Sequence, residues 1–231
     1  SGVMPYVIGI GAGLLCGALV GIINGVFIVK LKMVPFIMTL AMTNVLTGIG
    51  QVITKAALQP VRTSGFQPSS VKLGPVSMIV IIALLFAALF HFLLKYTVYG
   101  RHLTAQGNNN EAARKLGIHT ERNALIAYTI CGAMAGLGGI LSAGQVGAIS
   151  SNFASGNEFD IIPAAVLGGI SLFGGKGSVL PGALIGIVLV NTITNGLTMM
   201  AANPYVYTIV RGVIIFIAVM LDSINYKGEL R

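Results

Sequence analysis

The histidines, cysteines and acidic residues are the side chains that could catalyse a reaction or hold a metal, and they are few. The chain of 231 residues has three histidines, two cysteines and six acidic residues. No two histidines lie three or four residues apart, and no Gly-x-Ser-x-Gly turn presents a nucleophilic serine. We therefore expect no catalytic residue, no metal site and no cofactor, and any energy source must reside on another chain.

A glycine-rich stretch at residues 173–178 contains the lysine and serine of a phosphate-binding loop, but at the wrong spacing. That motif needs a glycine where Ile170 stands, and a serine or threonine directly after the lysine, where Gly177 stands. We predict a flexible cytoplasmic turn here and no ATP site.

Residues 95–122 are the longest polar stretch and contain the signals of one short helix. Asparagines at 108–110 can cap the start of the helix, and Gly117 can end it. Glu111 in the first turn, and Arg114 and Lys115 in the last, have the charges that the helix dipole favours. The apolar residues Ala112, Leu116 and Ile118 could dock on a partner protein or lie against a membrane surface. The residues by themselves favour the surface connector.

The composition indicates that membrane-spanning segments position these residues. Hydrophobic residues make up 55% of the chain and charged residues only 9%, against roughly 25% charged in soluble domains. Seven apolar segments approach the length that crosses a bilayer. They are 6–29, 34–53, 76–94, 124–149, 161–173, 179–197 and 205–221. The predicted fold is an all-α, polytopic transmembrane helical bundle with about seven segments, one of them short or re-entrant.

Lysine and arginine concentrate in alternate connections, which sets the predicted orientation. Residues 95–122 and 227–231 are rich in cations and belong in the cytoplasm, whereas 55–74 and 150–160 belong outside. The net charge of +8 thus reflects membrane topology and no nucleic-acid surface. A re-entrant 161–173 would place 227–231 outside, so the charges favour a short crossing.

Small and polar residues inside the segments predict how helices pack. In the first segment a glycine recurs every fourth residue, which forms one seam for close helix contact. The seam consists of Gly9, Gly13, Gly17, Gly21 and Gly25. Asparagines at 24, 44, 191 and 195 lie in apolar segments, where bonds between helices are favoured over substrate binding.

Arg211 lies inside the last apolar segment. An unpaired arginine there costs ~2.5–3.5 kcal/mol on insertion scales. It either extends to the membrane surface or pairs with Glu158 or Asp160 on the outer side, where such a pair could hold an outer gate.

Two blocks resemble the ribose/xylose/arabinose/galactose-type permeases of bacterial ABC importers. The first is Tyr99-Gly-Arg followed by Gly107-x-Asn109-x-Glu111-Ala112-Ala113-Arg114-x-x-Gly117-Ile118. The second runs from Gly156-x-Glu158-x-Asp160 to Gly174-Gly-Lys176-Gly-Ser-Val179. The similarity extends along the whole chain. Asn108, Asn110 and Pro163 depart from the family pattern, which puts the start of the loop helix and the straightness of the short segment in doubt.

The resemblance implies a sugar-transporting permease subunit of the inner membrane. It implies one transmembrane domain over 1–231, lacking an N-terminal part of roughly three spans, whose coupling helix near 108–118 contacts the ATPase subunit. The implied contact residues are Gly107, Asn109, Glu111, Ala112, Ala113, Arg114, Gly117 and Ile118. The implied partners are ATPase subunits, a second permease subunit, membrane lipid and a periplasmic or lipid-anchored sugar-binding protein. A nucleoside or branched-chain amino acid permease is the nearer alternative, and an intramembrane enzyme the more distant one.

Overall fold

A computed structural model describes residues 4–60, 72–73, 76–172, 174–200 and 203–229. Much of the expected outer loop 55–74, Phe173 of the second block and the terminal Arg231 lie outside these ranges. Within the described residues, six helices are long and apolar enough to cross a membrane. The predicted all-α polytopic architecture is confirmed, and the seventh predicted segment is a helix too short to span alone.

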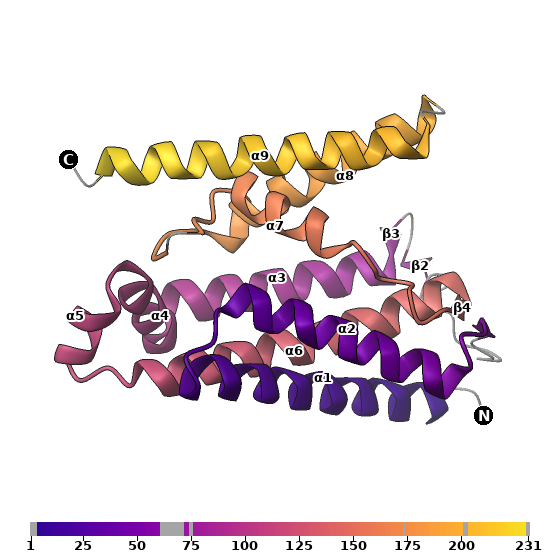
Figure 1. The fold of residues 1–231 in the computed structure, drawn as a ribbon, viewed down its shortest axis with the longest axis horizontal. Helices are drawn as coiled ribbons and strands as arrows, with labels where there is room; N and C mark the ends of the chain where they lie inside the picture. Colours follow the sequence, from indigo (N-terminus) through magenta and orange to yellow (C-terminus); the bar gives the residue numbers. More distant parts are fainter. Residues whose placement is uncertain (1–3, 61–71, 74–75, 173, 201–202, 230–231) are drawn as a thin grey trace. The chain divides into compact units, whose positions relative to one another are not determined.

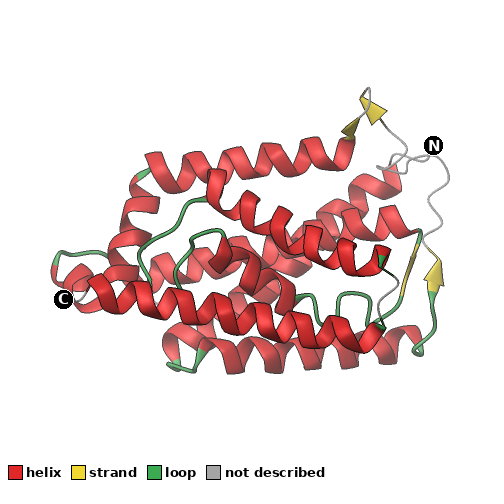
Figure 2. Cartoon of the chain, turned by 90° about the horizontal axis from the view of Figure 1, so that it is seen from above, coloured by secondary structure: helices red, strands yellow, loops and turns green. Residues whose placement is uncertain are grey.

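Helices form nearly all of the described chain, and the short strands lie together at one end of it (Figures 1 and 2). The helices are α1 Met4–Lys30, α2 Pro35–Thr54, α3 Met78–Tyr96, α4 Val98–Asn108, α5 Asn110–Lys115, α6 Thr120–Val146, α7 Glu158–Leu167, the π-helical turn η1 Val179–Ala183, α8 Leu184–Met199 and α9 Pro204–Glu229. Strand β1 (Gln59–Pro60) pairs antiparallel with β4 (Ala148–Ile149), and β2 (Lys72–Leu73) with β3 (Val76–Ser77).

The contacts divide the chain into two compact units. Unit 1 contains Ser1–Leu85 and Glu121–Ala154, and unit 2 contains Phe86–Thr120 and Ser155–Arg231. Helix α3 contributes its first part to unit 1 and its second part to unit 2.

Unit 1 is built on close contact between α1 and α6. A methyl group on Gly17 would overlap the backbone oxygen of Gly132, and one on Gly21 would overlap that of Tyr128. A methyl group on Gly13 would overlap the Ile140 side chain of α6, and one on Gly25 would overlap the Leu125 side chain. Figure 1 shows the two helices side by side. The seam predicted for α1 is therefore present at these four glycines, but Gly9 is a correction, because nothing lies within 4 Å of its Cβ position.

Side-chain hydrogen bonds join the end of α2 to the segment that follows α6. Thr54 and Ser151 share a hydroxyl hydrogen bond of 3.0 Å, and the Gln51 amide donates to the Asn152 side chain at 3.2 Å. Strands β1 and β4 pair beside them. These two connections therefore lie at one end of unit 1, as a shared outer side requires.

In unit 2 the short helix α7 packs against both α8 and α9. Pro163, Ala164 and Val166 of α7 are buried, as is Ala218 of α9. A side chain on Gly186 of α8 would overlap the backbone oxygen of Ala164. Small residues thus let the backbones approach closely.

The predicted short segment 161–173 is helical only in its first part. Helix α7 ends at Leu167, and the backbone at Gly169 turns into the left-handed region at φ +83°. Asp160 contacts Arg211 near the start of α9, and the Leu172 backbone N–H donates to Asp222, eleven residues further along α9, at 2.7 Å. Eleven helical residues span about 16 Å. A ten-residue helix and a non-helical segment together run along α9.

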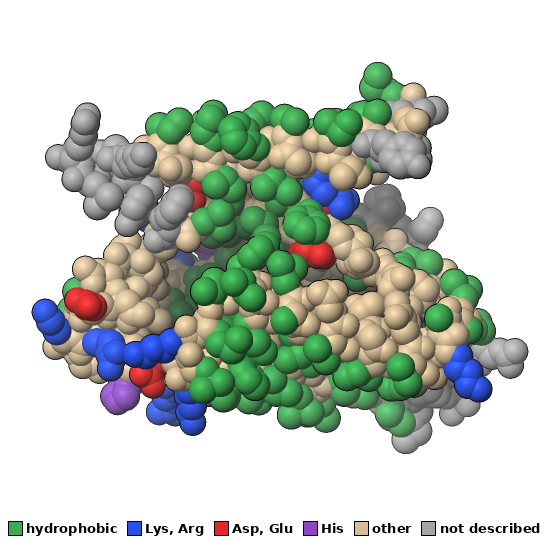
Figure 3. Space-filling view, viewed as in Figure 1, with side chains coloured by type: hydrophobic (Ala, Val, Ile, Leu, Met, Phe, Trp, Pro, Cys, Tyr) green, Lys and Arg blue, Asp and Glu red, His purple; other side chains and the backbone are tan. Residues whose placement is uncertain are grey.

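Large hydrophobic side chains are exposed along the helices. Val52 of α2 is 80% exposed and Phe216 of α9 is 69% exposed. On the face in Figure 3, hydrophobic groups cover the helix surfaces, and most of the Lys and Arg side chains gather near the helix ends. Such a surface is stable when lipid is the solvent.

Candidate functional site

Helix α5 has the caps that its sequence predicts. The Asn109 side chain accepts a hydrogen bond of 3.0 Å from the Ala112 backbone N–H, which identifies the N-cap among the three asparagines. At the other end Gly117 adopts φ +81°, and the Ile118 N–H donates to the Ala113 carbonyl at 3.1 Å. This is a Schellman ending, which favours glycine. The predicted helix and its stop are confirmed.

Helix α4 was missed by sequence reasoning, which predicted only one helix in 95–122. Two glycines in its eleven residues lower its helix propensity. The signal that could have revealed it is Thr97, whose hydroxyl caps the helix by accepting from the Gly100 N–H at 3.3 Å. Gly100 is buried, and a side chain there would overlap the Leu94 carbonyl at the turn between α3 and α4. Burial raises the pKa of the Tyr99 phenol in α4, which therefore stays neutral at physiological pH.

The two sequence blocks meet in space. A side chain on Gly107 at the end of α4 would overlap the backbone nitrogen of Gly175, and one on Gly174 would overlap the Gly107 carbonyl. The neighbouring Asn108 side chain occupies the Cβ position of Gly175. Where it is described, the stretch 173–178 is therefore packed against α4, which corrects the expectation of a flexible turn.

Helix α5 has one open side and one buried residue. Glu111, Ala112, Arg114 and Lys115 are exposed. Leu116 is 80% exposed, whereas Ala113 is only 2% exposed. The open side combines charge with one large apolar group. Ala113, expected as a contact residue, packs within the chain.

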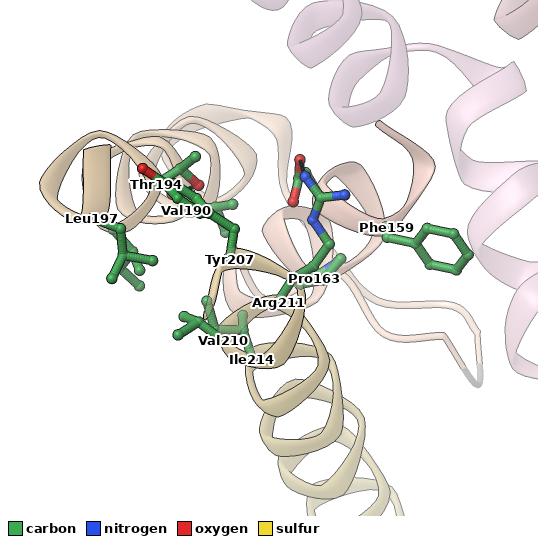
Figure 4. A pocket seen from close by; sticks show the side chains of 11 residues that line it. Phe159, Pro163, Val190, Thr194, Leu197, Tyr207, Val210, Arg211 and Ile214 are labelled. Atoms are coloured by element: carbon green, nitrogen blue, oxygen red, sulfur yellow. Dashed lines mark hydrogen bonds and ion pairs between the residues drawn. The ribbon is translucent and has the colours of Figure 1, made fainter. Parts of the chain in front are cut away.

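The side chain of Arg211 extends from α9 toward α7 (Figure 4). Its Nη2 lies 2.6 Å from the Asp160 carboxylate, and its Nη1 donates to the Gly156 carbonyl at 3.1 Å. The two side chains of the ion pair are 34% and 30% exposed. Of the two acids considered, the structure thus places Asp160, and not Glu158, in the ion pair. Asp160 also lies in the first turn of α7, where the helix dipole favours a carboxylate.

A small cavity adjoins this ion pair. Its volume is about 20 Å³, and its lining includes Thr194, Tyr207 and Ile214 as well as Arg211. The ring of Phe159 points away from the other lining side chains (Figure 4). A cavity of this size holds about one water molecule. A sugar needs a far larger space.

Two of the asparagines in the spans bond within their own helix, so the expected bonds between helices stay a prediction. Asn44 donates to the Leu40 carbonyl of its own helix at 3.1 Å, and Asn191 donates to the Ile187 carbonyl at 2.9 Å. Asn44, Asn191 and Asn195 are all exposed. Each retains an amide oxygen that lipid cannot satisfy.

Residues 1–219 match the family described as branched-chain amino acid transport system / permease component. The galactose/methyl galactoside import permease protein MglC of Escherichia coli (strain K12) is 36% identical over 92% of this chain and 66% of that protein. The ribose import permease protein RbsC of the same strain is 33% identical over 94% and 68%, and the fructose import permease protein FrcC of Rhizobium meliloti 31% over 95% and 63%.

The chain therefore spans about two thirds of the length of these relatives. No solved structure matches it. The family match covers nearly the whole chain, and six of its helices can span a membrane. This chain belongs to the permease component family of bacterial membrane transport systems, as a multi-pass protein of the inner membrane.

Proposed function

We propose that this chain is the membrane-spanning permease subunit of an ATP-driven importer that carries a simple sugar across the cytoplasmic membrane. The observation that carries the proposal is the backbone contact between Gly107 of α4 and Gly174–Gly175. Through α4, this contact links the capped and exposed helix α5 to a segment that runs along α9. A transporter driven by another chain needs such a mechanical link.

The names of the relatives support a sugar as the substrate. Permeases for galactose, ribose and fructose all align with more than nine tenths of this chain. The family description names branched-chain amino acids, so these remain the natural competitor in an uptake assay. The sugar passes through unchanged, and ATP hydrolysis takes place on separate cytoplasmic subunits.

Helix α5 is the proposed docking element for the ATPase subunit. Its exposed residues, including Glu111, Ala112 and Leu116, present charges beside one large apolar side chain. Ala113 fixes the helix to the chain from the other side. Movement of a docked ATPase would pass through α4 to Gly174–Gly175, and from there to α7 and α8. The permease would thereby shift between outward-open and inward-open states.

A second permease subunit and a sugar-binding protein complete the proposed importer. The exposed Asn191 and Asn195 on α8, and Asn44 on α2, are costly against lipid. In an assembled importer they would face the partner permease or a water-filled path, where their amide oxygens find hydrogen-bond donors. A periplasmic or lipid-anchored binding protein would deliver the sugar at the outer ends, near the proposed gate formed by Arg211 and Asp160.

Reconstitution with the ATPase and the sugar-binding protein tests the proposal. We expect Ala112→Asp, and separately Gly117→Val, to leave the permease inserted in the membrane while uptake of labelled sugar and co-purification of the ATPase are lost. The aspartate places a charge on the open side of α5. The valine is strained at φ +81° and displaces the end of the helix.

A matched control adds the same charge to the connection after α1, which Lys30 and Lys32 assign to the cytoplasmic side by the charge rule. Leu31→Asp changes a residue that is 63% exposed after α1, outside α5, and should preserve both uptake and ATPase binding. If uptake and co-purification survive both changes in the α5 segment, α5 is a connector and the proposal loses its main support. Labelled galactose, ribose, fructose and leucine in the same vesicles distinguish the substrate classes.

A further inference from the structure

A second, much larger cavity lies in unit 2, away from the ion pair. Its volume is about 940 Å³, and its walls are the end of α3, one side of α4, residues 170–171 and 175–178, and the start of η1. Three cations line it: Lys95, Arg101 and Lys176. No aspartate or glutamate is among the described residues that form its walls. We propose that this cavity binds the phosphate headgroup of an anionic phospholipid of the inner leaflet.

The cations come from three separate elements and meet at one cavity. Lys95 lies in the last turn of α3, Arg101 lies in α4, and Lys176 lies in the segment after α7. The Lys95 ammonium stands 5.6 Å from the centre of the Tyr96 ring, a distance typical of a cation–π contact. Lysine and arginine side chains bind phosphate oxygens by charge-assisted hydrogen bonds.

Hydrogen bonds fix the shape of the cavity walls. The Leu180 backbone N–H donates to Nδ1 of His91 at 3.3 Å, which joins η1 to α3. The Ser171 N–H donates to the Lys176 carbonyl at 3.1 Å, which closes the loop that carries Lys176.

The apolar part of the lining favours a lipid over a soluble anion. Leu94, Leu103, Ile170, Val179 and Leu180 line the same cavity as the three cations. An inorganic phosphate has no apolar surface to contact these groups, whereas the glycerol and first acyl carbons of a phospholipid can contact them. The volume also exceeds what one phosphate fills and lies within the range of pockets for larger ligands.

The position along α3 favours the same occupant. The apolar stretch of α3 ends at Tyr96, so Lys95 stands where the helix leaves the hydrocarbon. The distribution of Lys and Arg assigns this end to the cytoplasm, where the leaflet contains anionic lipids. Basic pockets between membrane helices on this side are suited to such headgroups. The inference goes beyond the proposed function, because lipid binding at this cavity can be measured without sugar or ATP.

Native mass spectrometry of the purified full chain, titrated with phosphatidylglycerol, tests the inference. Phosphatidylcholine gives the baseline for lipid without net charge. We expect the triple variant Lys95→Gln, Arg101→Gln, Lys176→Gln to bind phosphatidylglycerol roughly 100-fold more weakly, at about a fivefold loss for each cation. The control triple Lys30→Gln, Lys32→Gln, Arg122→Gln removes three exposed cations elsewhere and should bind like the parent chain.

A charge-conserving triple guards against a folding defect. Lys95→Arg, Arg101→Lys, Lys176→Arg keeps the cations and should retain binding. The proposal is overturned if the neutral cavity triple binds as tightly as the parent chain, or if the charge-conserving triple loses binding equally. Competition with millimolar inorganic phosphate and glycerol phosphate identifies the source of the phosphate. If the chain binds these soluble phosphates but does not bind phosphatidylglycerol, the cavity is a site for a soluble anion and the lipid assignment is overturned.

An acidic partner protein is the remaining occupant that the test separates. If the neutral cavity triple loses ATPase co-purification while phosphatidylglycerol binding is unchanged, the cavity is a protein contact and the inference fails. If lipid binding is lost while α5 still binds the ATPase, the lipid site stands independently of the coupling proposal.

Discussion

Arg211 is a charged side chain inside a spanning helix, and its environment supplies two acceptors. The Asp160 carboxylate balances its charge, and the Gly156 carbonyl accepts a second hydrogen bond. Both come from the start of the segment that packs along α9. A residue that costs several kcal/mol when unpaired in a bilayer therefore becomes a clamp between α7 and α9.

Arg211→Gln should destabilise unit 2 by about 1–2 kcal/mol and lower uptake, because a hydrogen-bonded ion pair is lost. The estimate takes the lower range for charged hydrogen bonds, since both side chains are about one third exposed. Thermal unfolding in detergent and sugar uptake in vesicles measure the two effects. The exchange of both residues, Arg211→Asp with Asp160→Arg, should recover part of the loss. Normal transport and stability in Arg211→Gln would refute the gate.

Gly175 combines a left-handed backbone with a contact to a side chain. Its φ is +67°, and a methyl group there would overlap the Asn108 side chain. Gly169 is also left-handed, at φ +83°, but has open space around its Cβ position. The two glycines therefore separate backbone strain from loss of the contact with α4.

We expect Gly175→Ala to lower the unfolding temperature more than Gly169→Ala. Strain costs about 1–2 kcal/mol at either position, and the overlap adds about 1–3 kcal/mol at Gly175 alone. Combining Gly175→Ala with Asn108→Ala should recover part of the additional loss in unfolding temperature, because the overlapping side chain is removed. Equal losses in the two single variants would show that the contact with α4 contributes nothing.

At the scale of elements, the contact between α1 and α6 depends on both helices having glycine where they meet. The α1 glycines spaced four apart face Gly132 and Gly136 of α6. Gly9 has the same spacing but faces open space. The seam is thus shorter than its sequence pattern, because the two helices are in close contact only from Gly13 to Gly25.

Gly17→Leu should separate α1 from α6 and cost about 3 kcal/mol or more, since the new side chain meets backbone atoms that cannot move aside. Gly9→Leu makes the same chemical change at an open position and should alter stability by about 0.5 kcal/mol or less. Size-exclusion elution and thermal unfolding compare the two variants. Similar behaviour of both would remove the seam as a packing element.

For the whole molecule, the contacts agree with the orientation that the charges predict. The ends of α2 and α6 are joined by Thr54 with Ser151 and by Gln51 with Asn152, so both connections lie on one side. In unit 2, the path from Asp160 to Leu172 follows α9 from Arg211 to Asp222. This path covers about 16 Å, roughly half of a hydrocarbon core. A full crossing by 161–173, which the charge pattern favours, stays a prediction.

Single cysteines in intact cells test this orientation. In a background with Cys16→Ser and Cys131→Ser, which removes both free thiols, Leu116→Cys should be labelled only after the membrane is permeabilised. Asn152→Cys should react with an impermeant reagent from outside, as should Lys55→Cys beside it. Labelling of residues 116 and 152 from the same face would reject the predicted topology.

The sequence alone was sufficient to place the six long spans and to locate the α5 helix with its glycine stop, because these depend on composition and neighbouring residues. The orientation of the spans stays a prediction. Asn109 and Gly117 act within one helix turn of the groups that they satisfy. Contacts between residues distant in the chain required the folded structure. It selected Asp160 over Glu158 as the partner of Arg211, and it brought Gly107 against Gly175. It also brought Lys95, Arg101 and Lys176 to one cavity. Each arises where separate elements approach, and a single sequence contains no signal for the distance between them.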